Sequence, residues 1–250
     1  MSGLRVEMEG AIGRITLDRP ENGNRMTVEM VRGLTDVLLN LANDPQAKAV
    51  LLRGTPPDFC RGRDREPAAS GPGESMKESV RQAIETIHAL YDSFERVPLP
   101  IISVVQGAAL GVGCAIAAAC DLTIASTEAR FALPEIADDR PPLLAIGALV
   151  DHVPPKALTY LAFSTDEIDG ASAVAFGLAS RVVMPANLEV EVERLLGFFA
   201  GRSTSALRTL KQYLRDSRRV DSTTARMRAA TILADLLGPS RQGSRGPEWH

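Results

Sequence analysis

At 250 residues, of which 45% are hydrophobic and 24% charged, the chain fits one large globular domain or a core with a smaller extension. Its formal charge of -3 excludes a strong overall field that would favour nucleic acid or an anionic membrane. The three cysteines form no disulfide framework, and the charged N-terminal segment lacks the apolar core of an export signal, so we expect a reducing, cytoplasmic location.

Predicted strands and helices alternate through the first part of the chain. Residues 4–9 and 11–17 have the pattern of two strands joined by a glycine turn. A helix is predicted over residues 27–43, where apolar side chains recur on one face, and a strand follows within residues 47–53. The loop over residues 55–73 is long for a compact domain and is therefore a candidate functional segment.

An apolar stretch over residues 100–121 lies in the middle of the chain. Its β-branched start predicts a buried strand over residues 101–105, and a tightly packed helix is predicted to begin between Gly111 and Gly113. A strand that leads into a helix N-terminus presents unpaired backbone N–H groups to an anion. The stretch is no transmembrane helix, because Gln106-Gly107 interrupts its apolar run.

The rest of the chain continues this alternation and then becomes helical. Strands are predicted at residues 122–126, 129–133 and 180–184, and helices at 76–97, 143–150, 156–163, 171–176 and in several segments from 187 onward. The alternation favours an α/β fold with a core domain over residues 1–190. Residues 191–250 are predicted to form a C-terminal helical region with a flexible tail from Gly238. Its apolar stripes favour oligomerisation, and packing on the chain's own core is the alternative.

Metal and nucleotide motifs are missing from the sequence. The histidines and cysteines are scattered without the spacing of metal ligands, so no metal site is predicted. The glycines also lack the Gly-Lys-Ser/Thr context of a phosphate-binding loop.

Several segments carry a resemblance to a known family. They are RITLDRPENGNRMTVEM, FCRGRD, PIISVVQGAALGVGCAIAAACDLTIAS, ARFALPEI and AVAFGLASRVV. In these segments the chain resembles the crotonase superfamily of enoyl-CoA hydratases and isomerases. The resemblance implies an α/β, crotonase-like spiral of strand–strand–helix units with a C-terminal helical trimerisation region. It also implies an acyl-CoA substrate, in which coenzyme A is part of the substrate and no separate cofactor is needed, and a homotrimer or dimer of trimers.

The resemblance also implies an oxyanion hole made by the backbone N–H groups of Arg63 and Val112. A thioester that loses its α-proton becomes an enolate, and preorganised N–H donors stabilise the charge on its oxygen. Arg63 stands where the family more often has a small residue, so its guanidinium could bind a CoA phosphate, cover the pocket or stay in solvent. The residues expected at the substrate or CoA are Arg25, Arg61, Asp64, Gly111, Ala115 and Asp139.

The carboxylates favour one reaction of the family over the others. Family hydratases use two glutamates, and Ala115 occupies the position of one of them, whereas Glu135 matches the other. A single base suffices to shift the double bond of an enoyl-CoA, so the leading hypothesis is an enoyl-CoA isomerase with Glu135 as catalytic base. Asp138 or Asp139 could be an extra acid or pair with Arg140. The alternatives are a catalytically weak CoA-ester-binding homologue, hydration, or thioester hydrolysis.

Overall fold

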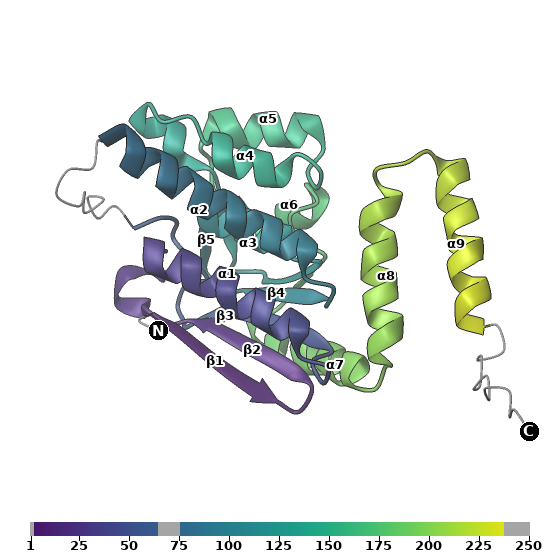
Figure 1. The fold of residues 1–250 in the computed structure, drawn as a ribbon. Helices are drawn as coiled ribbons and strands as arrows, with labels where there is room; N and C mark the ends of the chain where they lie inside the picture. Colours follow the sequence, from purple (N-terminus) through teal and green to yellow (C-terminus); the bar gives the residue numbers. More distant parts are fainter. Residues whose placement is uncertain (1–2, 65–75, 238–250) are drawn as a thin grey trace, which may run out of the picture. The chain divides into compact units, whose positions relative to one another are not determined.

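The computed structural model describes residues 3–64 and 76–237 (Figure 1). The chain divides into two compact units, residues 1–208 and residues 209–250. The first unit therefore extends beyond residue 190, the predicted end of the core domain. Residues 65–73 of the candidate functional loop, and the tail from Gly238 that was expected to be flexible, lie outside the described residues.

A six-stranded sheet forms the centre of the first unit, in the order β1-β2-β3-β4-β6-β9 (Figure 1). β1 and β2 pair antiparallel, and the other neighbouring strands pair in parallel. The strands are β1 (Leu4–Glu9), β2 (Ile12–Leu17), β3 (Ala49–Gly54), β4 (Ile101–Val105), β6 (Leu122–Ser126) and β9 (Arg181–Val183). The sequence pattern predicted all of them, with ends that differ by about one or two residues.

Successive side chains of the central strands enter different hydrophobic cores. In β3, Val50 and Leu52 belong to one core and Leu51 belongs to the other. In β4, Ile101 and Ile102 are divided in the same way. The two-residue period of a strand causes this alternation, and burial on both faces explains why these strands are continuous apolar runs.

Helices cover both faces of the six-stranded sheet. α1 (Val28–Asn43) packs against α2 (Met76–Arg96), and both contribute to the same core as α3 (Val112–Ala119). α7 (Leu188–Ala200) lies on the opposite face, where its Val192 side chain is completely buried. Because α7 packs on the sheet, the first unit cannot end near residue 190.

A second, three-stranded sheet lies beside the first and has the order β5-β7-β8. It contains β5 (Ala108–Leu110), β7 (Arg130–Ala132) and β8 (Ile168–Asp169). The sequence predicted β7 but neither β5 nor β8. The Ala-Ala-Leu sequence of β5 has no strand propensity of its own, and pairing with β7 decides its conformation. β5 leads directly to Gly111 and α3.

The remaining α-helices agree with the predicted ones. In the first unit they include α4 (Leu143–Leu149), α5 (Pro155–Ser164) and α6 (Gly170–Ala175). The sequence pattern does not predict the 3-10 turn η2 (Pro134–Asp138), which precedes α4. α8 (Thr204–Ser217) begins in the first unit, and α9 (Ser222–Leu237) belongs to the second. Within the second unit, the Tyr213 hydroxyl donates to the Ala225 carbonyl at 3.1 Å. Among the described helices, none is both long and apolar enough to cross a membrane.

Candidate active site

The two segments predicted to carry the oxyanion hole lie side by side. The Cys60 N–H donates to the Ala108 carbonyl at 2.9 Å, and the Leu110 N–H donates to the Cys60 carbonyl at 2.9 Å. These backbone bonds join the loop over residues 58–64 to β5, just before the turn at Gly111. Two segments that are far apart in the sequence thus share one local hydrogen-bond ladder.

Three glycines allow this close approach, each for a different reason. Gly62 has a φ of 102°, a left-handed conformation that side chains disfavour. A Cβ at Gly113 would collide with the Cys60 carbonyl oxygen, so this glycine serves packing between the two segments. Gly111 has a φ of 54°, and a Cβ there would collide with Oε1 of Glu135. Gly111 therefore lies directly against the predicted catalytic carboxylate.

A cavity of about 540 Å³ opens at this junction, within the size range of small-molecule sites. Six of the predicted site residues line it: Arg25, Arg61, Arg63, Asp64, Gly111 and Glu135. The other lining residues are Gly62, Pro134, Ala137, Asp138 and Arg140. Val112, Ala115 and Asp139 belong to the predicted set but do not line the cavity.

Glu135 has the electrostatic environment of a proton acceptor. It is half-buried on η2, and its buried Oε2 atom has no hydrogen-bond partner among the described residues. Burial raises the pKa of the Glu135 carboxyl, while its own backbone N–H and the charge of Arg140 act in the opposite direction. A carboxylate that is poorly stabilised in its charged form takes up a proton more readily, as a catalytic base must.

The backbone N–H groups of Arg63 and Val112 have no acceptor within the described part of the chain. Arg63 forms an isolated parallel bridge with Met26, in which the N–H groups of Met26 and Asp64 make the hydrogen bonds. The Arg63 N–H is left out of this pairing. Val112 is the first residue of α3, where N–H groups have no acceptor within the helix. Both groups are therefore able to donate to a ligand.

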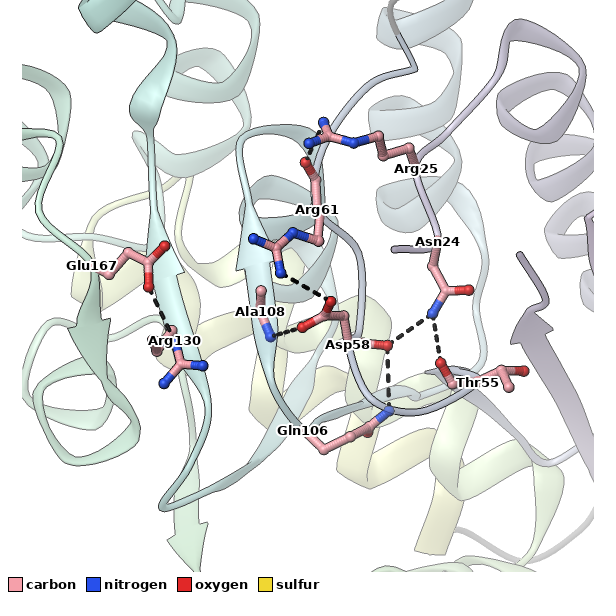
Figure 2. A network of polar contacts seen from close by, with 9 residues as sticks. All are labelled: Asn24, Arg25, Thr55, Asp58, Arg61, Gln106, Ala108, Arg130 and Glu167. Carbon is pink, nitrogen blue, oxygen red and sulfur yellow. Dashed lines mark hydrogen bonds and ion pairs between the residues drawn. The ribbon is translucent and has the colours of Figure 1, made fainter. Parts of the chain in front are cut away.

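Four of the seven charged side chains that line the cavity among the described residues are arginines. Arg25 donates to the carbonyl of Arg61 at 2.9 Å, and the Arg61 guanidinium pairs with Asp58 at 3.2 Å (Figure 2). The exposed Arg63 guanidinium has no partner among the described residues. A second cavity of about 580 Å³ shares Arg25, Arg61 and Asp64 with the first, so the two are neighbours.

Ion pairs hold two other carboxylates at the cavity. Asp64 accepts from Nη1 of Arg19 at 2.7 Å, an interaction that orients the end of the loop. Asp138 pairs with Arg140 at 2.7 Å. The Asp64 carboxylate thus differs from that of Glu135, whose Oε2 atom has no hydrogen-bond partner among the described residues.

Asp139 and Ala115 are set back from the cavity. Asp139 ends η2 in a left-handed conformation with a φ of 56°, and its N–H donates to the Ile136 carbonyl at 3.0 Å. Ala115 is completely buried in α3. Of the two neighbouring aspartates considered as extra acids, only Asp138 lines the same cavity as Glu135.

Two buried cysteines, Cys60 and Cys114, lie in the segments that form the site. Burial raises the pKa of Cys60 and of Cys114 to about 12, so both thiols are neutral near pH 7. No group of three or more possible metal-ligating His, Cys, Asp or Glu side chains occurs in the described part of the chain.

A polar network that the sequence pattern does not predict surrounds the start of the loop over residues 58–64 (Figure 2). Its central members are Asn24, Asp58 and Gln106, which bond mainly to backbone groups. Asn24 and Gln106 lie in segments that carry the family resemblance, and Asp58 precedes one of them. Their types alone gave no signal, because the backbone partners come from distant parts of the chain.

Curated relatives share most of the chain's length. An enoyl-CoA hydratase domain-containing protein 3, mitochondrial, from Xenopus laevis is 28% identical over 193 residues, which are 76% of this chain and 64% of that protein. The chain thus spans less than two thirds of the frog relative. A short-chain-enoyl-CoA hydratase from Clostridium acetobutylicum is 26% identical over 228 residues, covering 90% of this chain and 85% of that one.

The expected cytoplasmic location is wrong by this comparison, because the frog relative and its counterparts from other vertebrates are named mitochondrial. The expectation depended on scarce, unpaired cysteines, which indicate a reducing environment. A reducing environment is a property of more than one compartment, so the cysteines could not identify the cytoplasm.

Solved structures and the family model agree with the fold and the segments described above. A crystal structure from Thermobifida fusca, in complex with CoA, has a TM-score of 0.83 and 28% sequence identity, and the match covers 95% of each chain. The family model of enoyl-CoA hydratase/isomerase matches residues 7–240. The chain therefore belongs to the enoyl-CoA hydratase/isomerase family, within the crotonase superfamily.

Proposed function

We propose that the protein is an enoyl-CoA isomerase that uses Glu135 as its only catalytic base. The observation that carries this proposal is the Glu135 carboxylate at the cavity, whose buried Oε2 atom has no hydrogen-bond partner among the described residues, combined with alanine at position 115. Asp64, another carboxylate of the wall, is held by Arg19. Hydration needs an acid and a base at two positions, whereas isomerisation needs one group that acts twice.

In the proposed reaction, the Glu135 carboxylate removes a proton from the α-carbon of a 3-enoyl-CoA. The electron pair of that C–H bond moves into the conjugated system, which becomes a dienolate with its charge on the thioester oxygen. The protonated Glu135 then returns the proton to the γ-carbon, and the double bond moves to the 2-position. The proton count is unchanged, so no other reactant is needed.

The backbone N–H groups of Arg63 and Val112 are proposed to bind the dienolate oxygen. Their lack of an acceptor within the described chain supports this role. One such donor can contribute about 3–4 kcal/mol to the transition state. Because the donors belong to the backbone, the large Arg63 side chain remains available for another task.

We further propose that the arginines at the cavity rim bind the phosphates of CoA, which enters as part of the substrate and not as a separate cofactor. The shared wall of the two neighbouring cavities supports a site for an extended ligand. The T. fusca structure, which is described as a complex with CoA, adds support from a relative.

Replacing Arg63 with alanine is expected to raise KM for an enoyl-CoA about fivefold and to leave kcat nearly unchanged. The exposed guanidinium would contribute a weak ion pair, whereas the backbone N–H persists in the variant. Steady-state kinetics would measure both constants, with Arg63→Lys as the charge-conserving control. A large fall in kcat without a change in KM would contradict this assignment.

The experiment that tests the proposed function is product analysis with 3-enoyl-CoA and 2-enoyl-CoA substrates of several chain lengths. An isomerase converts the first into the second, and water adds to neither. Formation of 3-hydroxyacyl-CoA as the main product would overturn the proposal and support a hydratase. The names of the relatives favour hydratase activity. In a hydratase, Asp138 at the cavity wall could act with Glu135 as the other carboxylate.

Replacing Arg140 with alanine is expected to move the acidic limb of the kcat/KM profile to higher pH. The charge of Arg140 lowers the pKa of Glu135, and only the ionised carboxylate can accept a proton. For the same reason, the wild-type limb should lie above the ordinary glutamate value of about 4.3, since burial raises this pKa. Arg140→Lys keeps the charge and should keep the wild-type limb, and an unmoved limb in Arg140→Ala would contradict the coupling.

A homotrimer or a dimer of trimers is the proposed assembly. Large exposed apolar side chains in the first unit, among them Leu143, Phe163 and Val190, support burial against another copy. Light scattering coupled to size exclusion would give the mass directly, and a monomer at micromolar concentration would contradict the proposal.

A further inference from the structure

Asp58 lies where the two halves of the candidate oxyanion hole meet. It is the first residue of the loop over residues 58–64, which carries Arg63. Its side chain reaches β5, which leads to Gly111 and Val112 (Figure 2). We propose that Asp58 is a positioning residue that fixes the two N–H donors relative to each other. The inference rests on the proposed oxyanion hole. It does not depend on whether the protein catalyses isomerisation or another reaction of the family.

The Asp58 carboxylate connects two segments that have no sequence proximity. Its Oδ1 atom accepts the backbone N–H of Ala108, the first residue of β5, at 2.8 Å. Its Oδ2 atom accepts from the Arg61 guanidinium at 3.2 Å. Asp58 is only 8% exposed, so water competes little for these bonds.

The backbone of Asp58 is fixed as firmly as its side chain. Nδ2 of Asn24 donates to the carbonyls of Asp58 and Thr55, both at 2.8 Å. Oδ1 of the same amide accepts the Arg19 N–H at 2.9 Å, so every polar atom of the completely buried Asn24 side chain is used. Nε2 of Gln106 donates to the Gly54 carbonyl at 2.8 Å. The same atom lies 3.5 Å from the Asp58 carbonyl oxygen, to which it also donates (Figure 2).

The Asp58 carboxylate packs closely against the turn before β5. A Cβ at Gly107 would lie 2.8 Å from Oδ1 of Asp58, so the carboxylate is in tight contact with the turn before β5. The loop is held at its far end as well, because Arg19 binds Asp64 at 2.7 Å. The Arg63 N–H lies between these two anchors. Loss of the Asp58 carboxylate would remove the first anchor and leave the backbone bonds of Phe59 and Cys60 as the remaining link to β5.

The test compares wild-type protein with Asp58→Ala and Asp58→Asn, using butyryl-CoA labelled with carbon-13 at its carbonyl. This saturated ester undergoes neither isomerisation nor hydration, and an oxyanion hole should both polarise its carbonyl and promote exchange of its α-protons with D2O. In Asp58→Ala we expect exchange to slow about 10- to 100-fold, with butyryl-CoA affinity changed less than about threefold. The carbonyl infrared band of the bound ester should shift toward that of the free ester.

Asp58→Asn should restore exchange to within about threefold of the wild-type rate, because an amide oxygen can still accept the Ala108 N–H. Asp121→Ala is the matched control, since Oδ2 of Asp121 accepts the N–H of Ile101 at the start of β4 at 2.7 Å. This control loses the same type of bond at another strand and should keep both the wild-type exchange rate and the wild-type carbonyl band.

Three results would overturn the inference: a wild-type exchange rate and carbonyl band in Asp58→Ala, an equal loss in Asp121→Ala, or an unpolarised carbonyl in the wild-type complex. Failure of the proposed isomerase is distinguishable from all three. If the wild-type protein polarises butyryl-CoA but does not convert 3-enoyl-CoA, the isomerase proposal fails and the role of Asp58 stands.

Discussion

Replacing Glu135 with glutamine is expected to reduce isomerisation about 10²- to 10⁴-fold, the usual contribution of a general base. Glutamine has nearly the same shape and can occupy the space beside Gly111, but it cannot accept the α-proton. The KM for an enoyl-CoA should change little, because Glu135 acts on the reacting carbon and not on CoA. Spectrophotometric assay of 2-enoyl-CoA formation, together with α-proton exchange in D2O, would measure the loss.

The stability of Glu135→Gln provides an internal control for this experiment. The pKa of Glu135 is raised in the folded protein, so the ionised form is less favourable there than in the unfolded chain. The raised pKa stabilises the folded protein at low pH, where the carboxyl is protonated. This stabilisation is lost as the pH rises and the carboxyl ionises. At pH 7 the melting temperature of the Glu135→Gln variant should therefore equal or exceed that of the wild type. Full activity in the variant would exclude the single-base mechanism.

Replacing Gly111 with alanine is expected to reduce activity about 10²- to 10³-fold, comparable to the loss of an oxyanion donor. The new methyl group would collide with Oε1 of Glu135, and the left-handed backbone with a φ of 54° disfavours any side chain. Both the base and the adjacent Val112 N–H would then move. Because the effect is on placement, kcat should fall more than the affinity for the substrate.

Gly197→Ala is the matched control for this substitution. A Cβ at Gly197, in α7, meets no atom within 4 Å, and helical alanine is more stable than glycine by about 1 kcal/mol. This variant should retain wild-type kinetics and a melting temperature at least as high. Equal kinetic losses in the two variants would contradict a specific role for Gly111.

Position 115, where the family hydratases have their other glutamate, is occupied by alanine in this chain. Ala115 is buried in α3 and does not line the cavity, so the second carboxylate of a hydratase is absent from its usual position. Asp138 is the described carboxylate that could replace it, and it already pairs with Arg140. The choice between isomerase and hydratase thus depends on whether Asp138 can leave that ion pair, which product analysis would reveal.

Much of the fold could be predicted from local pattern. β3 and β4 are continuous apolar runs because both of their faces are buried, and α1 has one apolar stripe because it covers one face of the sheet. β5 and β8 could not be found in this way. They have three residues and two residues, and partner strands from elsewhere in the chain decide their conformation.

The sequence by itself determined the family resemblance, the candidate base and the two segments that carry the candidate N–H donors. These features depend on residue type and local order, which are present before folding. Only the tertiary structure decided that Gly111 lies against Glu135, that Gly113 serves packing, and that Asp58 connects the loop to β5. Such contacts join residues distant in the chain, and backbone groups, which every residue carries, make most of the bonds. A sequence pattern therefore cannot reveal them, because their specificity comes from position in the fold and not from side-chain type.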